Sequence, residues 1–135
     1  MHDGAGMPTG ITVNSFSSLS LDPPLVMFSV GKRQVSCRWF RENDHFTVNV
    51  LAADQDDIAW RFARPVDDKF EGVDWDEGEN GMPRLKGAVA TFECKKWNIM
   101  EGGDHLIIVG QVEAFSATDD DPLLFFRGGM RQIGE

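Results

Sequence analysis

The side chains best suited to hold a polar ligand lie near the start of the chain, in the stretch 10–21, which reads GITVNSFSSLSL. Its apolar residues alternate with hydroxyl and amide residues, so Thr12 and Asn14 share one face of the expected strand. Ser18 and Ser20 share a face further along. These groups offer donors and acceptors to a ligand with a heteroatom edge. The same side chains could instead solvate the outside of an edge strand, and part of the stretch could form a turn.

Two further groups could take part in binding. His105 follows Gly102-Gly103-Asp104 at the start of an apolar run, where an imidazole could donate to a carbonyl or pair with a phosphate. Lys32-Arg33 is the basic pair close to the serine-rich stretch, and it could also meet a phosphate. A solvated turn histidine and ordinary surface charge explain these residues equally well.

Sequence motifs for catalysis or metal binding are missing from the chain. Cys37 and Cys94 lie far apart, with no second cysteine or nearby histidine at metal-ligand spacing, so they are interpreted as reduced thiols. No serine is tied to a histidine and an acid, which argues against a hydrolase. A GxGxxG turn, a Walker loop and a GxSxG elbow are also absent. A nucleotide would therefore bind without those devices.

The elements that must position these groups are mostly strands. Periodicity and turn residues predict strands over 10–21, 25–30, 45–51, 85–97, 104–116 and 123–132. Asp22-Pro23-Pro24 ends the first of them. Because the connections are short, and because parallel strands would each need a helical crossover, the pattern favours an antiparallel barrel.

Two short helices and one irregular segment complete the prediction. A helix is expected over 36–43, with Ser36 as its N-cap, and another over 55–64, where acidic residues open the first turn. The acidic, glycine-rich segment 67–84 shows no clean period and should be a surface excursion.

Length and composition limit the classes of protein to consider. The chain has 135 residues, the size of one domain, and 22 acidic against 13 basic residues give a net charge of −9. This charge opposes a phosphate backbone, so nucleic-acid binding is not expected. The apolar runs fall far short of the roughly 20 residues that span a bilayer. We therefore expect a cytoplasmic protein with no membrane partner.

The stretch 10–26 resembles the signature of the flavin reductase family, whose members supply reduced flavin to two-component monooxygenases. Agreement continues over nearly the whole chain, through 46–55, 62–63, 102–113 and 122–129. The resemblance implies the FMN-binding split barrel, an all-β antiparallel Greek-key barrel with one or two short helices, as one domain over 1–135. It also implies a homodimer in which NADH or NADPH reduces FMN or FAD, and the reduced flavin leaves for an oxygenase.

The resemblance also assigns site residues. The stretch 12–15 would contact the flavin ring, and Ser18, Ser20 and the basic turn after the next strand would approach the ribityl chain and phosphate. His105 matches the histidine of the family's Gly-Asp-His turn, near the expected nicotinamide. The implied binding residues are Thr12, Val13, Asn14, Ser15, Ser18, Ser20, Lys32, Ser36, Phe62 and His105. No catalytic residue or metal is implied, because hydride passes directly from nicotinamide C4 to flavin N5.

Two departures from the family pattern lead to further expectations. Family members usually have a helix and a first barrel strand ahead of the turn that matches 3–10, so the chain is expected to lack that strand, which would expose a sheet edge. Residues 32–38 match the family only loosely, so the resemblance does not assign each phosphate contact in this segment to a residue. The alternatives are a flavin-binding barrel without reductase activity and a split barrel that binds heme or another ligand.

Overall fold

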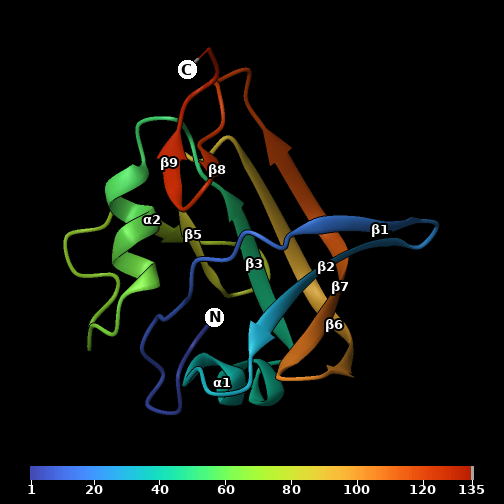
Figure 1. Ribbon diagram of the computed structural model, residues 1–135. Coiled ribbons are helices and arrows are strands. Elements are labelled where there is room, and N and C mark those ends of the chain that lie inside the picture. Colours follow the sequence, from blue (N-terminus) through green and yellow to red (C-terminus); the bar gives the residue numbers. More distant parts are fainter. Residues whose placement is uncertain (135) are drawn as a thin grey trace.

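The computed structural model describes residues 1–134 and centres on one five-stranded antiparallel sheet. Its strands are β1 (Ser17–Leu21), β2 (Pro24–Gly31), β3 (His45–Val50), β6 (Ala90–Gly102) and β7 (His105–Ala117). Their order across the sheet is β1-β2-β7-β6-β3. β6 and β7 form one long hairpin that turns at Gly103-Asp104, and β1 with the beginning of β2 extends from the body as an arm (Figure 1).

Two helices and two small hairpins surround this sheet. They are α1 (Ser36–Glu42), α2 (Asp56–Ala63), β4 (Trp75–Glu77) with β5 (Pro83–Leu85), and β8 (Leu124–Phe126) with β9 (Gly129–Arg131). Figure 1 shows α1 at the lower end of the sheet, α2 at its left and the β8–β9 hairpin above, while the N-terminal segment crosses between them. None of the helices in residues 1–134 combines the length and the apolar content needed to cross a bilayer.

The core is packed around three phenylalanines. Phe28 from β2 lies 5.3 Å from Phe40 of α1 and 5.4 Å from Phe46 of β3, measured between ring centroids, and each pair meets edge to face. This arrangement suits the quadrupoles of the rings and adds to the energy of burial. Both cysteines, Cys37 and Cys94, are buried and free, as the sequence predicts.

Gly110 is expected to be essential for this packing. It lies on β7, and an added Cβ would stand 2.5 Å from Phe46 Cζ and 2.9 Å from Cys94 Cβ. Gly110→Ala should therefore lower the free energy of unfolding by about 1–3 kcal/mol, the usual cost of overpacking a core. Urea denaturation measures this loss. Gly129→Ala is the control, since its Cβ would have only ordinary contacts; equal losses in the two variants would contradict the packing described here.

The N-terminal half of the predicted strand 10–21 and the predicted N-cap are wrong. The ladder with β2 begins only at Ser17, opposite Met27, because Thr12 bonds to α2 and Ser15 meets β2 through its side chain instead of its backbone. Helix α1 begins at Ser36, and Val35 is the capping position, with helical dihedrals and no side-chain cap. Ser36 therefore lies inside the first turn, with its side chain buried.

Positive-φ residues explain the other differences. The predicted strand 85–97 is broken at Gly87, whose φ is 82°, so β6 starts at Ala90. The predicted strand 123–132 is a hairpin that turns at Arg127 and Gly128, with φ values of 51° and 77°. The excursion 67–84 contains β4 and the start of β5. The strands expected over 25–30, 45–51 and 104–116 and both helices are confirmed within a residue or two.

Candidate functional site

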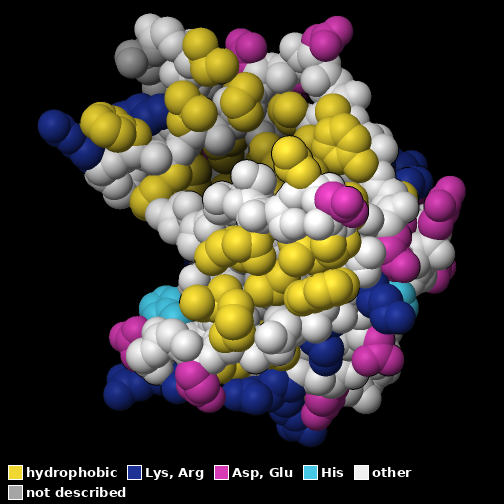
Figure 2. All heavy atoms as spheres, turned by 90° about the vertical axis from the view of Figure 1, so that its right-hand side faces the viewer, with side chains coloured by type: hydrophobic (Ala, Val, Ile, Leu, Met, Phe, Trp, Pro, Cys, Tyr) yellow, Lys and Arg dark blue, Asp and Glu magenta, His cyan; other side chains and the backbone are white. Residues whose placement is uncertain are grey.

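A cavity of about 610 Å³ opens on one side of the molecule, and its size suits a small-molecule ligand. Its walls come from the N-terminal segment 9–16, from β2 and β3, from α2, and from the β5 and β8–β9 regions. Figure 2 shows the corresponding indentation at the left edge of the molecule, with hydrophobic side chains above and below it. Elements that are far apart in the sequence thus meet around one space.

The lining of this cavity is almost free of charge. Among the described residues, no aspartate, glutamate, lysine or arginine lines it, and His105 is the one titratable side chain there. This is notable in a chain with 22 acidic and 13 basic residues. Because a charged group is costly to bury without a partner, the cavity suits an uncharged ring system better than an ion.

Two hydroxyls of the opening stretch hold the cavity wall in place. Thr12 Oγ1 donates to the carbonyl of Ala59 in α2 at 2.6 Å. Ser15 Oγ accepts a hydrogen bond from the backbone N–H of Ser29 in β2 at 2.9 Å. These bonds replace a strand ladder and fix the segment between helix and sheet. The side chains of Thr12 and Ser15 are therefore already engaged within the protein.

Asn14 differs from these neighbours. It lines the cavity and is exposed, and its amide makes no hydrogen bond to any other described residue. An amide side chain carries both donors and an acceptor. Asn14 is therefore a polar group of this wall that is available to a ligand. Val13 and Phe62, also singled out from the sequence, line the same cavity.

Ser18 and Ser20 do not line the cavity. They lie on β1, where a bulge interrupts the pairing, so their partners in β2 are the consecutive residues Val26 and Leu25. Consecutive strand residues point to opposite faces, and the two serines therefore do so as well. The shared face expected from alternation is wrong.

Lys32 and Ser36 also lie outside the cavity lining. Lys32 borders a separate, shallow depression of about 450 Å³, which adjoins the cavity at their common residue Gln34. Its ammonium pairs with Glu101, and this contact lowers the pKa of the Glu101 carboxyl. Ser36 Oγ is buried and has no hydrogen-bond partner within residues 1–134.

His105 stands at the mouth of the cavity. It starts β7 opposite Gly31, and its Nδ1 lies 2.8 Å from Oδ1 of Asp104. This hydrogen bond, followed by the charge of the imidazole, lowers the pKa of the exposed Asp104 carboxyl. The backbone N–H of Lys32 donates to the carbonyl of Asp104 at 2.9 Å, which ties the two turns together. The ring is thus oriented beside the opening.

Sequence reasoning missed several cavity residues. They are contributed by β3, by the segment after α2 and by the C-terminal hairpin: Asn49, Phe70, Pro83, Leu85, Leu124, Phe125 and Met130. The polar face of the predicted strand 45–51 could have pointed to Asn49. For the others no sequence pattern indicates a place at the site, although Leu85, Leu124, Phe125 and Met130 fall within the predicted strands 85–97 and 123–132.

The sequence is similar to a known family over nearly its full length. A family model described as "Flavin reductase like domain" matches residues 2–134. The stachydrine N-demethylase reductase subunit Stc3 of Rhizobium meliloti is 42% identical over 127 residues, which cover 94% of this chain and 55% of that protein. The FMN reductase (NADH) SmoA of Agrobacterium fabrum is 45% identical over 121 residues, covering 90% and 69%. The chain thus spans about half the length of the first relative.

Solved structures share the fold. The NADH:FAD oxidoreductase SgcE6 of Streptomyces globisporus C-1027, in complex with NAD and FAD fragments, has a TM-score of 0.91 and 40% identity over 97% of this chain and 79% of its own. Nitrilotriacetate monooxygenase component B from Mycobacterium thermoresistibile has a TM-score of 0.92 and 36% identity over 98% and 75%. These likenesses confirm the predicted class, an all-β antiparallel split barrel with two short helices.

Proposed function

The chain belongs to the flavin reductase family, and on that premise we propose that it is an NAD(P)H-dependent flavin reductase. It transfers hydride from NADH or NADPH to FMN or FAD and supplies the reduced flavin to a partner monooxygenase. One observation carries the proposal: among the described residues, no aspartate, glutamate, lysine or arginine lines the cavity of about 610 Å³, and the Asn14 amide in its wall has no protein partner. A flavin-reductase-like domain over 1–135 would hold this site.

The residues present fit a flavin ring. The ring is uncharged, aromatic and edged with heteroatoms, and the cavity offers apolar walls with Phe62 and Trp60 among them. Asn14 would hydrogen-bond the edge of the ring. Thr12 and Ser15 would hold this wall of the cavity in place, with Val13 packed beside them. The bound flavin would supply the chemistry by accepting hydride from the reduced nicotinamide. The protein's part is to position the rings and exclude water.

The phosphate end of the flavin would lie toward Gln34, where the cavity adjoins the shallow basic depression. Lys32 lines that depression, and Ser36, which stands between its lining residues Val35 and Cys37, carries a buried hydroxyl with no partner in residues 1–134. Charge-assisted hydrogen bonds would suit a phosphate there. Ser18 and Ser20 lie on opposite faces of the β1 arm, so one of the two would reach the part of the ligand that leaves the cavity.

His105 is assigned to the nicotinamide. His105→Ala should raise KM for NADH or NADPH roughly 2- to 10-fold, the worth of one hydrogen bond, while kcat changes little. Steady-state kinetics at saturating flavin measures the change. His45→Ala is the matched control, because His45 pairs with Glu113 and does not line the cavity. A change in flavin affinity alone would show that His105 is wrongly assigned.

A steady-state assay that crosses FMN and FAD with NADH and NADPH tests the function. At least one combination should bleach the visible band of the flavin. A folded sample that binds flavin tightly but oxidises neither nicotinamide would identify a non-catalytic flavin-binding barrel. A Soret band would instead identify a heme protein. The same assay would establish the preferred flavin and nicotinamide.

The partners are a second copy of the chain, a flavin-dependent oxygenase and the two nucleotides, in the cytoplasm. Large apolar side chains support the homodimer: Leu21 on β1 is 94% exposed, and Trp97 and Phe115 on β6 and β7 are 53% and 59% exposed. Such exposed apolar surface is typical of interaction sites. Sedimentation analysis should give twice the mass of the chain, and the mass of a single chain at micromolar concentration would exclude the dimer.

A further inference from the structure

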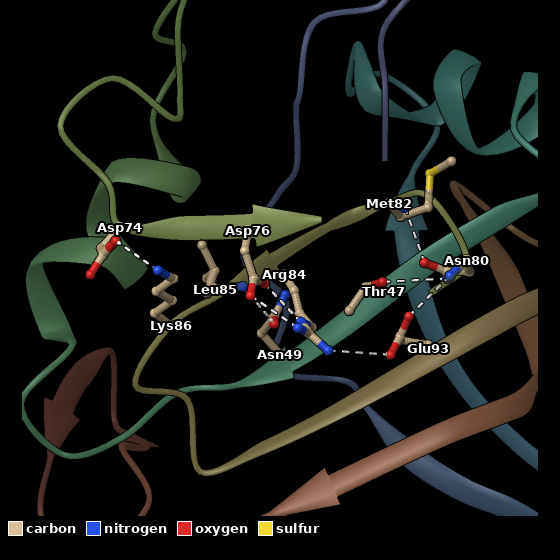
Figure 3. A network of polar contacts seen from close by, with 10 residues as sticks. All are labelled: Thr47, Asn49, Asp74, Asp76, Asn80, Met82, Arg84, Leu85, Lys86 and Glu93. Atoms are coloured by element: carbon tan, nitrogen blue, oxygen red, sulfur yellow. Dashed lines mark hydrogen bonds and ion pairs between the residues drawn. The ribbon is translucent and has the colours of Figure 1, made fainter. Parts of the chain in front are cut away.

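The β4–β5 hairpin is attached to the five-stranded sheet through side chains. Between residues 75–85 and that sheet, every hydrogen bond among the described residues involves a side chain, and β4–β5 forms a sheet of its own. Figure 3 shows these contacts gathered between the hairpin and strands β3 and β6. The hydrogen bonds that position the hairpin thus come from a few polar side chains, in addition to the packing of Met82 against the core and the burial of Pro83.

Glu93 of β6 is central among these groups. It is only 5% exposed, and its Oε1 accepts a hydrogen bond from the backbone N–H of Asn80 at 3.1 Å. Its Oε2 lies 3.7 Å from Nη1 of Arg84 on β5. The Arg84 guanidinium also donates to both carboxylate oxygens of Asp76 on β4, at 2.8 and 2.9 Å. One buried carboxylate thus contacts the turn directly and both strands through Arg84.

The backbone of the hairpin lies directly against this carboxylate. An added Cβ on Gly78 would stand 2.3 Å from Oε1 of Glu93 and 2.8 Å from its Cδ. No larger residue fits at position 78 unless the hairpin or Glu93 moves. Gly78→Ala would therefore displace either the hairpin or the Glu93 carboxylate from this contact, without removing any charge.

The hairpin in turn forms part of the cavity wall. Asn80 Nδ2 donates to the carbonyl of Phe46 at 3.3 Å, and the backbone N–H of Leu85 donates to Oδ1 of Asn49 at 3.1 Å. Asn49, Leu85 and Pro83 line the cavity, whereas Glu93 does not. Any loosening of the hairpin would thus move residues that face the ligand.

We propose that Glu93 is a positioning residue: its carboxylate fastens the β4–β5 hairpin to the sheet and so fixes the Pro83 and Leu85 wall of the flavin cavity. The identity of the ligand rests on the proposed function. Without the carboxylate, the hairpin is mobile in the free protein, and binding must then order it. Ordering a wall on binding weakens affinity without changing the groups that touch the ligand.

Hydrogen exchange of the ligand-free protein tests the fastening. Glu93→Ala should speed amide exchange at least tenfold in 75–85, while exchange in β7 stays as in the wild type. In Glu93→Gln, the exchange rate in 75–85 should lie between those of the wild type and Glu93→Ala. This variant keeps the acceptor for Asn80 but loses the charge that faces Arg84. Unchanged exchange in 75–85 would overturn the proposal.

Flavin titrations test the consequence for the cavity. Glu93→Ala and Gly78→Ala should each raise the Kd for the preferred flavin roughly 3- to 30-fold. In the Glu93→Ala background, Gly78→Ala should add less than about twofold, because the atom with which it collides is gone. Full additivity would overturn the proposal. Val109→Ala is the control, since Val109 is buried but does not line the cavity.

The outcomes separate this inference from the proposed function. Val109→Ala should lower the melting temperature and leave Kd unchanged; a Kd raised as much as in Glu93→Ala would show a general effect of stability and overturn the role of Glu93. Wild-type protein that binds neither FMN nor FAD would overturn the proposed function, together with the assignment of Glu93 to a flavin wall. Wild-type binding with an unchanged Kd in Glu93→Ala would overturn the assignment of Glu93 alone.

Discussion

Phe28→Ala is expected to lower the free energy of unfolding by about 3–5 kcal/mol, the usual cost of truncating a buried phenylalanine. Phe28 is 3% exposed and meets Phe40 and Phe46 edge to face, so its removal leaves a cavity and breaks two aromatic pairs. These rings join β2, α1 and β3, and all three of them line the cavity. Urea denaturation should show a lower midpoint with an unchanged m-value.

Phe126→Ala is the matched control for this variant. Phe126 is 59% exposed on β8, and its loss should change the free energy of unfolding by no more than about 0.5 kcal/mol. If the two variants lost equal stability, the three-phenylalanine cluster would not be the centre of the core.

Asn14→Ala is expected to weaken flavin binding by about 1–3 kcal/mol, the cost of leaving a buried ligand group without its partner. This corresponds to a roughly 5- to 150-fold rise in Kd. The reason is that the side chains of Thr12 and Ser15 already hydrogen-bond to the backbone of Ala59 and Ser29. The Asn14 amide, by contrast, lines the cavity with no partner among the described residues. Quenching of flavin fluorescence measures the Kd.

Ser17→Ala provides the comparison for Asn14. Ser17 starts β1, its hydroxyl donates to the carbonyl of Ser18, and it does not line the cavity. Its removal should leave the Kd within about twofold of the wild type, because no ligand contact is lost. Equal Kd values in the wild type and Asn14→Ala would place the ring elsewhere.

Regular elements of the fold could be predicted because their signals are local. Strands β2, β3 and β7 show apolar runs or alternation bounded by turn residues, and α2 has its acidic first turn. The segment 10–16 alternates in the same way, yet it is not a strand. Its hydroxyls bond to Ala59 and Ser29, and no local pattern reveals these distant partners.

The candidate site could be predicted only in part, because some of its residues carry a local signal and others are placed by contacts between distant residues. The stretch 12–15 lines the cavity, as does His105, but a one-residue bulge redirected Ser18 and Ser20, and a bulge leaves no mark in a period-two pattern. The wall at Pro83 and Leu85 could not be foreseen, because the side chains of Asn49, Asn80 and Glu93 place it through contacts distant in sequence. Hydrogen bonds that side chains make to segments distant in the sequence cannot be predicted from periodicity.

A competition titration with lumiflavin, the flavin ring without ribityl chain or phosphate, tests most directly whether the uncharged cavity grips the ring. Lumiflavin should displace FMN from the protein, and Asn14→Ala should weaken both ligands by the same factor, while ribose 5-phosphate should not compete. Displacement of FMN by ribose 5-phosphate but not by lumiflavin would contradict the account.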